Sequence, residues 1–514
     1  MTRNSGTPDA APSPGDRVVH AALGPGRVVR LERGGRWLWV AFDRSPLLPF
    51  RVRGPELAAE SGNADVRKDD LPQPNRALQG AASMESRPRD EARGSDGEAG
   101  RGSFAGPEPR DVVRHRALVV LEALRLGTVP HGNLRAYTVG RDANLEAVLS
   151  ALDPTPGAGG RLRVVVGDYG TGKTHLMESV RDEALERGWA VASATLDSRE
   201  TTPAHPRRVY SALVRSLSLP AFRDPGGLGA LFDVLIERGG EAACTYERGG
   251  HRYLGPALHY YARLGDRPEL RDLLLEWIEG QPGERSNELN DLLRHSLPGP
   301  RLLALPDYRT FALAYAYVLG GVACLCREAG ARGLCLLLDE AEFYAALDAE
   351  NRGFADNLFG CYSLAALGGG EARREEIDLA RGGQEVHRRL PLRYRVDQPL
   401  ACAFFLTPQP QGLEALDRWV ELSRHAVELS PLRPAHYAEL YERIHRLYET
   451  AHPGFSLPGK LARPMGEFLH AALAAGAIAN PRAVLKLLVE FLDICRLSPH
   501  HLGAVLDDLG RLFA

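Results

Sequence analysis

The sequence lacks the features that mark a membrane-spanning or secreted chain. None of its apolar stretches approaches the ~20 uninterrupted residues that a transmembrane helix needs. Its first residues, MTRNSGTPDAAPSPGD, contain no apolar run of the kind found in a signal peptide, so we expect a cytoplasmic protein. The 514-residue chain also lacks a large net charge, since its formal charge is −3. Any contact with DNA therefore has to come from a local patch rather than from a global positive field.

Cysteine and lysine are both scarce. Seven cysteines are present and no two of them form a C-x-x-C pair, so the sequence predicts neither a disulfide framework nor a zinc site. Cys324 and Cys326 lie in an apolar helical run, and we expect all the cysteines to be small buried side chains. Nearly all of the 63 basic residues are arginine, so Lys173 is one of very few lysines and stands in a motif described below.

Composition separates a short N-terminal region from the rest of the chain. Residues 15–59 contain short alternating strands at 17–20, 26–31 and 37–42, with Gly and Pro at the turns. The stretch GDRVVHAALGPGRVV resembles the Tudor/SH3-like modules of some bacterial helicases and polymerase-binding factors, which implies a small β-barrel. A folded appendage without a binding role is the plainer alternative. Residues 60–108 hold few apolar side chains, so they are predicted to be a disordered linker.

From residue 109 onward the pattern is that of an α/β protein. Near-continuous apolar runs at 162–166, 190–196, 334–338 and 401–406 are typical of strands buried on both faces of a parallel sheet. Helical periodicity fills the intervals, so we expect a parallel sheet flanked by helices. The predicted parts are a core at 109–430, a helical insertion within it at about 205–330, and a helical C-terminal lid or domain at 431–514.

The first of these runs ends in a glycine-rich stretch, GDYGTGKT, that matches the phosphate-loop pattern G-x-x-x-x-G-K-[ST]. Its glycines let backbone N–H groups turn toward a β-phosphate, and Lys173 would neutralise the β- and γ-phosphates. The Thr174 hydroxyl would bind Mg²⁺. A buried strand enters the motif and a helix leaves it, so a P-loop NTPase that binds ATP and Mg²⁺ is predicted. The predicted nucleotide-binding residues here are Gly167, Asp168, Tyr169, Gly170, Thr171, Gly172, Lys173, Thr174 and His175.

A second polar site follows the apolar run in GLCLLLDEAEFY. Asp339 and Glu340 stand at the carboxyl end of a predicted strand, where open α/β sheets bind their ligands. Asp339 would hold Mg²⁺ through water, and Glu340 would polarise the water that attacks the γ-phosphate. Glu342 is the alternative base if the register differs, and a solvated strand end is the plain alternative for the pair.

Three further residues occupy places where AAA+ ATPases carry catalytic side chains. Thr407 ends the run ACAFFLT and resembles sensor 1, which places the attacking water, although a strand-end cap is an alternative. Arg424, in ELSRHAVELSPL, resembles the arginine finger that one subunit supplies to its neighbour, which implies a homo-oligomer; Arg418 competes for this role. Arg482 stands at the first turn of a predicted helix in NPRAVLKLLV and resembles the sensor 2 arginine of an AAA+ lid.

Upstream of the phosphate loop, the stretch TVGRDANLEAV contains Gly140 and Arg141. It resembles the GR box of the origin-recognition and STAND branches of the AAA+ superfamily. The resemblance implies that these two residues lie near the base and the ribose of the nucleotide.

Taken in order, these pieces resemble one family over about residues 110–500. They are LRLGTVPHGNLRAYTVGRDANLEAV, VVVGDYGTGKTHLM, LLLDEAE and NPRAVLKLLV, with a threonine-tipped strand before the last. Together they resemble the ATP-binding proteins of bacterial BREX-type phage-defence systems, the BrxD-like family. The resemblance implies an AAA+-like ATPase that is usually encoded beside a large superfamily 2 helicase, its expected protein partner.

Several functions stay open at this point. Arginines within 373–395 could contact the phosphates of double-stranded DNA, although acidic neighbours nearly balance them. The leading hypothesis is an ATP-hydrolysing component of a DNA-directed defence or repair machine. A STAND-like scaffold that binds ATP to change conformation, with little hydrolysis, is the main alternative. A small-molecule kinase is a third hypothesis, which predicts transfer of phosphate to an acceptor other than water.

Overall fold

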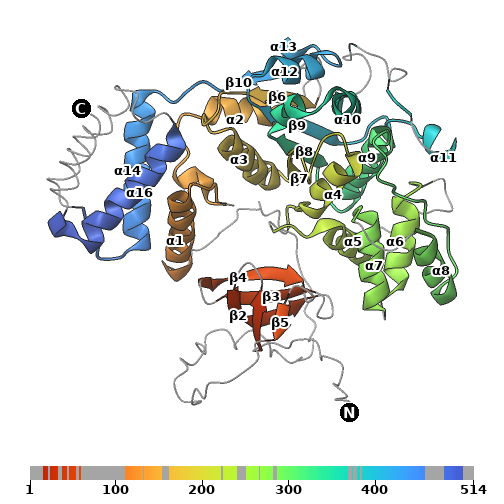
Figure 1. Cartoon of the computed structure of the whole chain (residues 1–514), viewed down its shortest axis with the longest axis horizontal. Coiled ribbons are helices and arrows are strands. Elements are labelled where there is room, and N and C mark those ends of the chain that lie inside the picture. Colours follow the sequence, from red (N-terminus) through yellow and green to blue (C-terminus); the bar gives the residue numbers. More distant parts are fainter. Residues whose placement is uncertain are drawn as a thin grey trace, which may run out of the picture. The chain divides into compact units, whose positions relative to one another are not determined.

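The computed structural model describes the chain as two compact units, Met1–Glu108 and Pro109–Ala514 (Figure 1). The predicted linker 60–108 lies outside the described residues, as do two parts of the predicted C-terminal region, 458–479 and 502–514. The described residues are 16–20, 24–32, 37–42, 45–53, 57–59, 110–130, 132–152, 161–221, 224–239, 250–265, 267–281, 286–367, 373, 379–381, 385–457 and 480–501.

The N-terminal unit contains one antiparallel sheet in the order β4-β3-β2-β1-β5. Val28 pairs with Val40, and both side chains are buried along with Val18, so one face of the sheet forms a small apolar core. The three predicted strands are confirmed with small differences in their ends, whereas closure into a barrel is not seen among the described pairs. The strands are β1 (Arg17–His20), β2 (Gly24–Glu32), β3 (Trp37–Phe42), β4 (Ser45–Arg53) and β5 (Leu57–Ala59).

The second unit is built on the predicted parallel sheet, in the order β10-β6-β9-β8-β7. Side chains on both faces are buried, which explains why the strands appear in the sequence as continuous apolar runs. β9 lies between β6 and β8, so the end of β9 falls between the phosphate loop and the acidic pair. The strands are β6 (Leu162–Val166), β7 (Ala190–Thr195), β8 (Leu334–Asp339), β9 (Leu400–Leu406) and β10 (Ala426–Glu428).

Helices cover the two faces of this sheet and form two separate cores. Val165, Leu337 and Phe405 face α2 and α3, whereas neighbouring positions such as Val164 and Phe404 face α4, α9 and α10. The residues of each strand therefore alternate between the two cores. These helices are α2 (Asp142–Leu149), α3 (Lys173–Glu186), α4 (Pro206–Arg215), α9 (Ala312–Glu328) and α10 (Ala349–Leu367).

The described residues between β7 and β8, where a helical insertion is predicted, form helices α4 to α9 (Figure 1). Among the described residues, Cys324, Cys326, Cys335, Cys361, Cys402 and Cys495 are all buried. Among the residues that the structure describes, no helix is long and apolar enough to cross a membrane. Besides α4 and α9, this region contains α5 (Gly227–Glu237), α6 (Leu254–Arg263), α7 (Pro268–Ile278) and α8 (Ser286–Ser296).

Short elements lie elsewhere in the second unit. They are η3 (Leu134–Ala136), η6 (Ala341–Ala346), α11 (Glu385–Arg388), α12 (Pro410–Asp417), α13 (Leu422–His425) and η8 (Pro499–His501).

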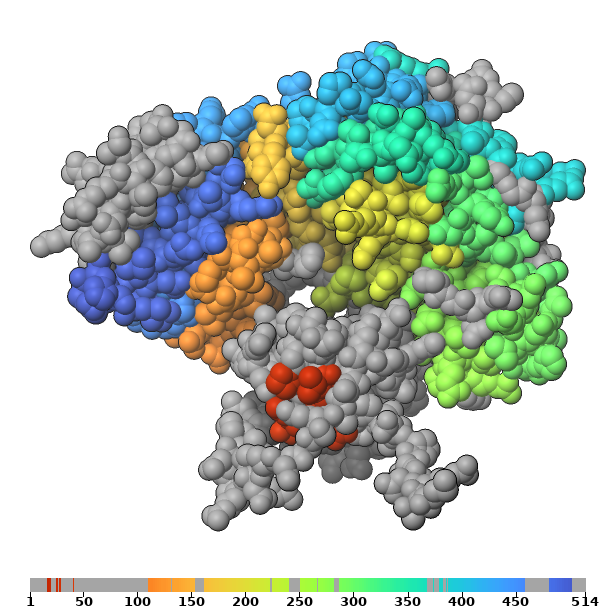
Figure 2. All heavy atoms as spheres, viewed as in Figure 1, coloured from red at the N-terminus to blue at the C-terminus, as the bar shows by residue number. Residues whose placement is uncertain are grey.

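A third core joins the start of this unit to its end. α1 (Arg110–Leu126) packs against α14 (Pro434–Ala451) and α16 (Pro481–Leu497), and the surfaces of these helices lie side by side in Figure 2. The Arg125 guanidinium donates two hydrogen bonds to the Asp493 carboxylate, at 3.1 and 2.7 Å. We call α1, α14 and α16 the lid helices. The helix at the start of this unit thus belongs with the C-terminal helices.

Candidate functional site

The phosphate loop lies between β6 and α3 and has the backbone that its glycines allow. Gly170 and Gly172 have φ values of 80° and 96°, in the left-handed region that favours glycine. A Cβ atom at Gly170 would lie 2.7 Å from the Cβ of Asn480, which caps the N-terminus of α16. The loop therefore needs glycine both for its own turn and for its close contact with a lid helix.

Lys173 is buried at the start of α3 and its ammonium group is held by three uncharged oxygens. It donates to the carbonyl oxygens of Gly167 at 3.0 Å and Asp168 at 3.3 Å, and to the hydroxyl of Thr407 at 2.9 Å. The structure thus brings together two predicted residues, Lys173 and Thr407, that stand 234 positions apart in the chain.

Thr174 and Asp339 form the second contact across the sheet edge. The Thr174 hydroxyl donates to Oδ2 of Asp339 at 2.7 Å. Asp339 is only 1% exposed, and its Oδ1 atom has no hydrogen-bond partner among the described residues. Burial raises the pKa of this carboxyl group. A hydroxyl and a carboxylate with an unfilled oxygen fit Mg²⁺, which takes few protein ligands and keeps waters and phosphate oxygens. The described residues contain no group of three or more His, Cys, Asp or Glu side chains that could hold a metal alone.

Glu340 has an unusual backbone for a residue with a side chain, since its φ is 57°. Such left-handed residues cost about 1–3 kcal/mol and gather at active sites. Burial, together with the Glu342 and Asp339 carboxylates, raises the pKa of Glu340 to about 7. Three carboxyl groups therefore crowd this end of β8, and their mutual repulsion favours a cation or a proton among them.

A cavity opens between the phosphate loop and the lid helices. Its lining combines the phosphate loop and Glu340 with a set of apolar side chains. This combination suits a nucleotide, which has charged phosphates and an apolar base. The apolar lining residues include Leu124, Val129, Tyr137, Val139, Leu432 and Leu440, which come from α1, from the segment after it, from the segment before α14 and from α14.

Arg141 lines the cavity, but its guanidinium is hydrogen-bonded to the protein backbone. Its guanidinium donates to the carbonyl oxygens of Thr171 at 2.7 Å and Ser430 at 2.8 Å. Thr171 belongs to the phosphate loop, and Ser430 lies between β10 and α14. Arg141 therefore ties the phosphate loop to the chain that leads into the lid.

Gly140 allows a second contact with the lid. Its φ is 61°, and a Cβ atom added there would lie 2.6 Å from the His436 ring at the start of α14. We expect Gly140→Ala to lower the free energy of unfolding by about 1–3 kcal/mol more than Gly132→Ala does, because only the first substitution adds a clash with the lid. Gly132→Ala is the control, because Gly132 also has a positive φ but nothing lies within 4 Å of the added atom. Urea denaturation of both variants checks the prediction, which an equal loss of stability would contradict.

His175 lines the cavity and contacts two residues, Tyr137 and Thr138, that sequence reasoning missed. Its Nε2 atom lies 2.8 Å from the Thr138 hydroxyl, and its ring centroid lies 5.0 Å from that of Tyr137. Burial, followed by the charge of Arg141, lowers the pKa of His175 to about 4, so the ring is neutral near pH 7. The apolar spacing of the upstream segment could have indicated Tyr137, but no motif marks it.

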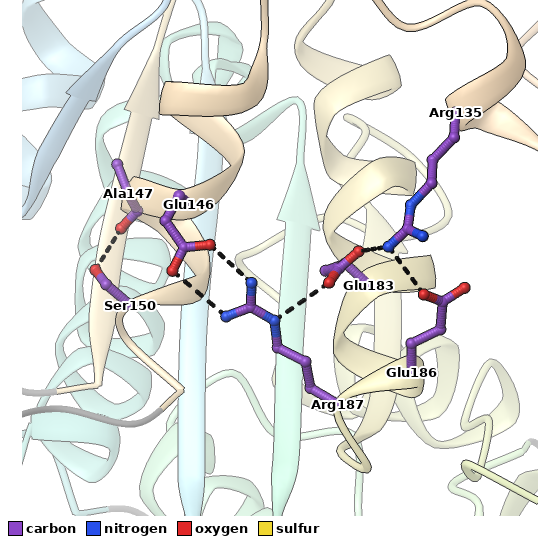
Figure 3. A network of polar contacts seen from close by, with 7 residues as sticks. All are labelled: Arg135, Glu146, Ala147, Ser150, Glu183, Glu186 and Arg187. Carbon is purple, nitrogen blue, oxygen red and sulfur yellow. Dashed lines mark hydrogen bonds and ion pairs between the residues drawn. The ribbon is translucent and has the colours of Figure 1, made fainter. Parts of the chain in front are cut away.

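Ion pairs hold η3 and α2, which precede the phosphate loop in the chain, against α3 (Figure 3). Arg135, in η3, pairs with Glu183 and with Glu186 at 2.9 Å, both on α3. Arg187, just after α3, pairs with Glu183 at 3.3 Å and with Glu146 of α2 at 2.7 Å. Exposed pairs of this kind contribute only about 0–1 kcal/mol each. These pairs instead fix positions. They hold η3 and α2 against α3, the helix that begins at the phosphate loop.

The predicted arginines occupy different surroundings. Arg482 lines the cavity from the first turn of α16, and its role as sensor 2 stays a prediction. Arg424 lies outside the cavity lining, with an exposed side chain that pairs with Glu421 at 3.0 Å. Arg418 pairs with Asp356.

Several arginines of the segment 373–395 donate to the protein itself. Arg373 bonds the carbonyl oxygen of Asp417 at 3.1 Å, and Arg381 bonds that of Leu390 at 3.0 Å. Contact between this segment and DNA stays a prediction.

Comparison with known proteins shows what the segment around the phosphate loop is similar to. Residues 112–251 match the family model described as BREX system ATP-binding protein BrxC/D. The match runs from α1 through the phosphate loop to the region between β7 and β8, and over these residues it confirms the predicted resemblance. A search of curated proteins gave no match.

Proposed function

From this match to BREX system ATP-binding proteins, together with the geometry of the cavity, we propose that the chain is an AAA+-like ATPase in a DNA-directed machine of bacterial phage defence. The observation that carries the proposal is the meeting of Lys173, Thr407, Thr174 and Asp339 at one edge of the sheet. The phosphate loop alone would support binding. An acidic strand end within reach of the loop adds the groups that hydrolysis needs.

In the proposed reaction, water attacks the γ-phosphorus of ATP, the bond to the bridging oxygen breaks, and ADP and phosphate leave. Lys173 turns from its backbone carbonyls to the β- and γ-phosphates. Glu340 takes a proton from the water as the new P–O bond forms and returns it to the products. Thr174 and, through water, Asp339 would hold Mg²⁺, which would supply positive charge against the charge that develops on the phosphate oxygens.

Two arginines would complete the site. Arg482 lies at the cavity, and we propose that it contacts the γ-phosphate from the lid. Arg424 is exposed, which supports a role as a finger directed at the nucleotide of a neighbouring subunit in a homo-oligomer. Hydrolysis would then depend on assembly. A superfamily 2 helicase is the proposed protein partner, on the family resemblance.

The test is an ATPase assay of the full chain with Mg²⁺, with and without double-stranded DNA, beside mass photometry with a non-hydrolysable ATP analogue. We expect turnover, its stimulation by DNA, and assembly with the analogue. Negligible turnover that DNA does not change, with ATP tightly bound, would favour the STAND-like switch instead. The main support for that alternative is the number of contacts between the phosphate loop and the lid, which link nucleotide binding to conformation.

A further inference from the structure

Glu342 is a third acidic residue beside the site, and its contact is specific. It lies in η6, and its Oε1 atom accepts a hydrogen bond from the hydroxyl of Thr407. That hydroxyl also lies 2.9 Å from the Lys173 ammonium. The second carboxylate oxygen of Glu342, Oε2, is buried and has no partner among the described residues.

This arrangement fixes the direction of the Thr407 hydroxyl. A hydroxyl has one proton and two lone pairs, whereas an ammonium group can only donate. Thr407 therefore accepts from Lys173 and gives its single proton to Glu342. A hydroxyl that donates to a carboxylate is also a stronger acceptor, because hydrogen bonds in a chain polarise one another.

We propose that Glu342 is a positioning residue that keeps the Thr407 hydroxyl turned as a hydrogen-bond acceptor. The inference rests on the proposed hydrolysis. When ATP draws Lys173 to its phosphates, the lone pair of Thr407 becomes free. The attacking water can then donate one proton to Thr407 and present the other to Glu340. Thr407 would orient the water rather than donate to the γ-phosphate.

The roles of base and positioning residue predict different results for two substitutions. Gln keeps an oxygen that accepts from Thr407, but it has no useful basicity. We expect Glu342→Gln to keep kcat within about threefold of the wild type, because the hydroxyl keeps its direction. Glu342→Ala should lower kcat by about 10- to 100-fold, the range expected for loss of a hydrogen bond to a charged group. An equal loss in both variants would overturn the proposal, since Glu342 would then act as the base.

A double-mutant cycle tests whether Glu342 acts through Thr407. Thr407→Val removes the hydroxyl, and we expect Glu342→Ala to cause no further loss of kcat in that background. Thr407→Ser keeps the hydroxyl and should restore the sensitivity to Glu342→Ala. Glu350→Ala is the charge-matched control, because Glu350 is an exposed residue of α10 that pairs with Arg309. Additive effects of Glu342→Ala and Thr407→Val would overturn the proposal.

ATP affinity provides a readout that does not depend on turnover. Glu342→Ala removes a negative charge and weakens the acceptor that holds Lys173 in the free protein. We therefore expect the variant to bind ATP as tightly as the wild type or up to about tenfold more tightly. A disrupted site would bind it more weakly, and weaker binding would overturn the inference. A wild type without turnover would contradict the proposed function instead, whereas weaker ATP binding by Glu342→Ala in an active protein would contradict the positioning role alone.

Discussion

Lys173→Ala is expected to abolish ATP binding and ATP turnover together. The ammonium is buried between two backbone carbonyls and a hydroxyl, and these neutral partners can be exchanged for phosphate oxygens without breaking an ion pair. Each hydrogen bond between charged groups contributes about 1.5–3 kcal/mol, so losing two of them should weaken ATP binding at least about 100-fold. Isothermal titration calorimetry with ATP and Mg²⁺ measures the change.

The chain offers a matched control for this experiment. Lys486 is exposed on α16, carries the same charge and does not line the cavity. Lys486→Ala should therefore bind ATP like the wild type. If Lys173→Ala also retained wild-type affinity, the assignment of the phosphate loop would be wrong.

Glu340→Gln is expected to separate binding from hydrolysis. Gln has the size of Glu and can keep the same backbone, but it cannot take a proton from water. Loss of a positioned base lowers kcat by about 10²–10⁴-fold. Affinity for ATP should stay the same or increase, because one of three crowded carboxylates is removed. Single-turnover kinetics and retention of labelled ATP during gel filtration check both parts.

Comparison of Glu340→Gln with Glu342→Gln shows which of the two carboxylates is the base. Glu340→Gln should stop turnover, whereas Glu342→Gln should leave most of it. The opposite order would show that the base is the second acid, two residues further along. Loss of ATP binding in Glu340→Gln would instead mean that the residue is needed for the structure of the site.

The sequence predicted the parts of the structure that strong local rules determine. The buried strand at 162–166 has the same bounds in the structure, because a near-continuous apolar run, interrupted by Arg163, ends at the glycine-rich loop. The phosphate loop could be predicted because its backbone has positive φ values at Gly170 and Gly172, and such values favour glycine. The acidic strand end was predicted from a run of leucines that stops at Asp339.

Contacts between distant segments could not be predicted in the same way. The apolar stripe of α1 shows that the helix packs against something, but not that its partners are α14 and α16, more than 300 positions away. Arg141 was assigned to the nucleotide from a motif, whereas its hydrogen bonds run to two carbonyl groups that no pattern identifies. The pairing of Glu342 with Thr407 likewise depends on the order of strands in the sheet.

The packing of α1 has a consequence for the response of the second unit to nucleotide. The chain enters the second unit at Arg110, and α1 is a rod of 17 residues, about 26 Å long at the usual rise per residue. Gly127 follows the far end of α1, and a Cβ atom added at Gly127 would lie 3.6 Å from the Cδ atom of Arg482. A shift of Arg482 on nucleotide binding would thus act directly on the C-terminal end of α1 and, through the packing of α1, on α14.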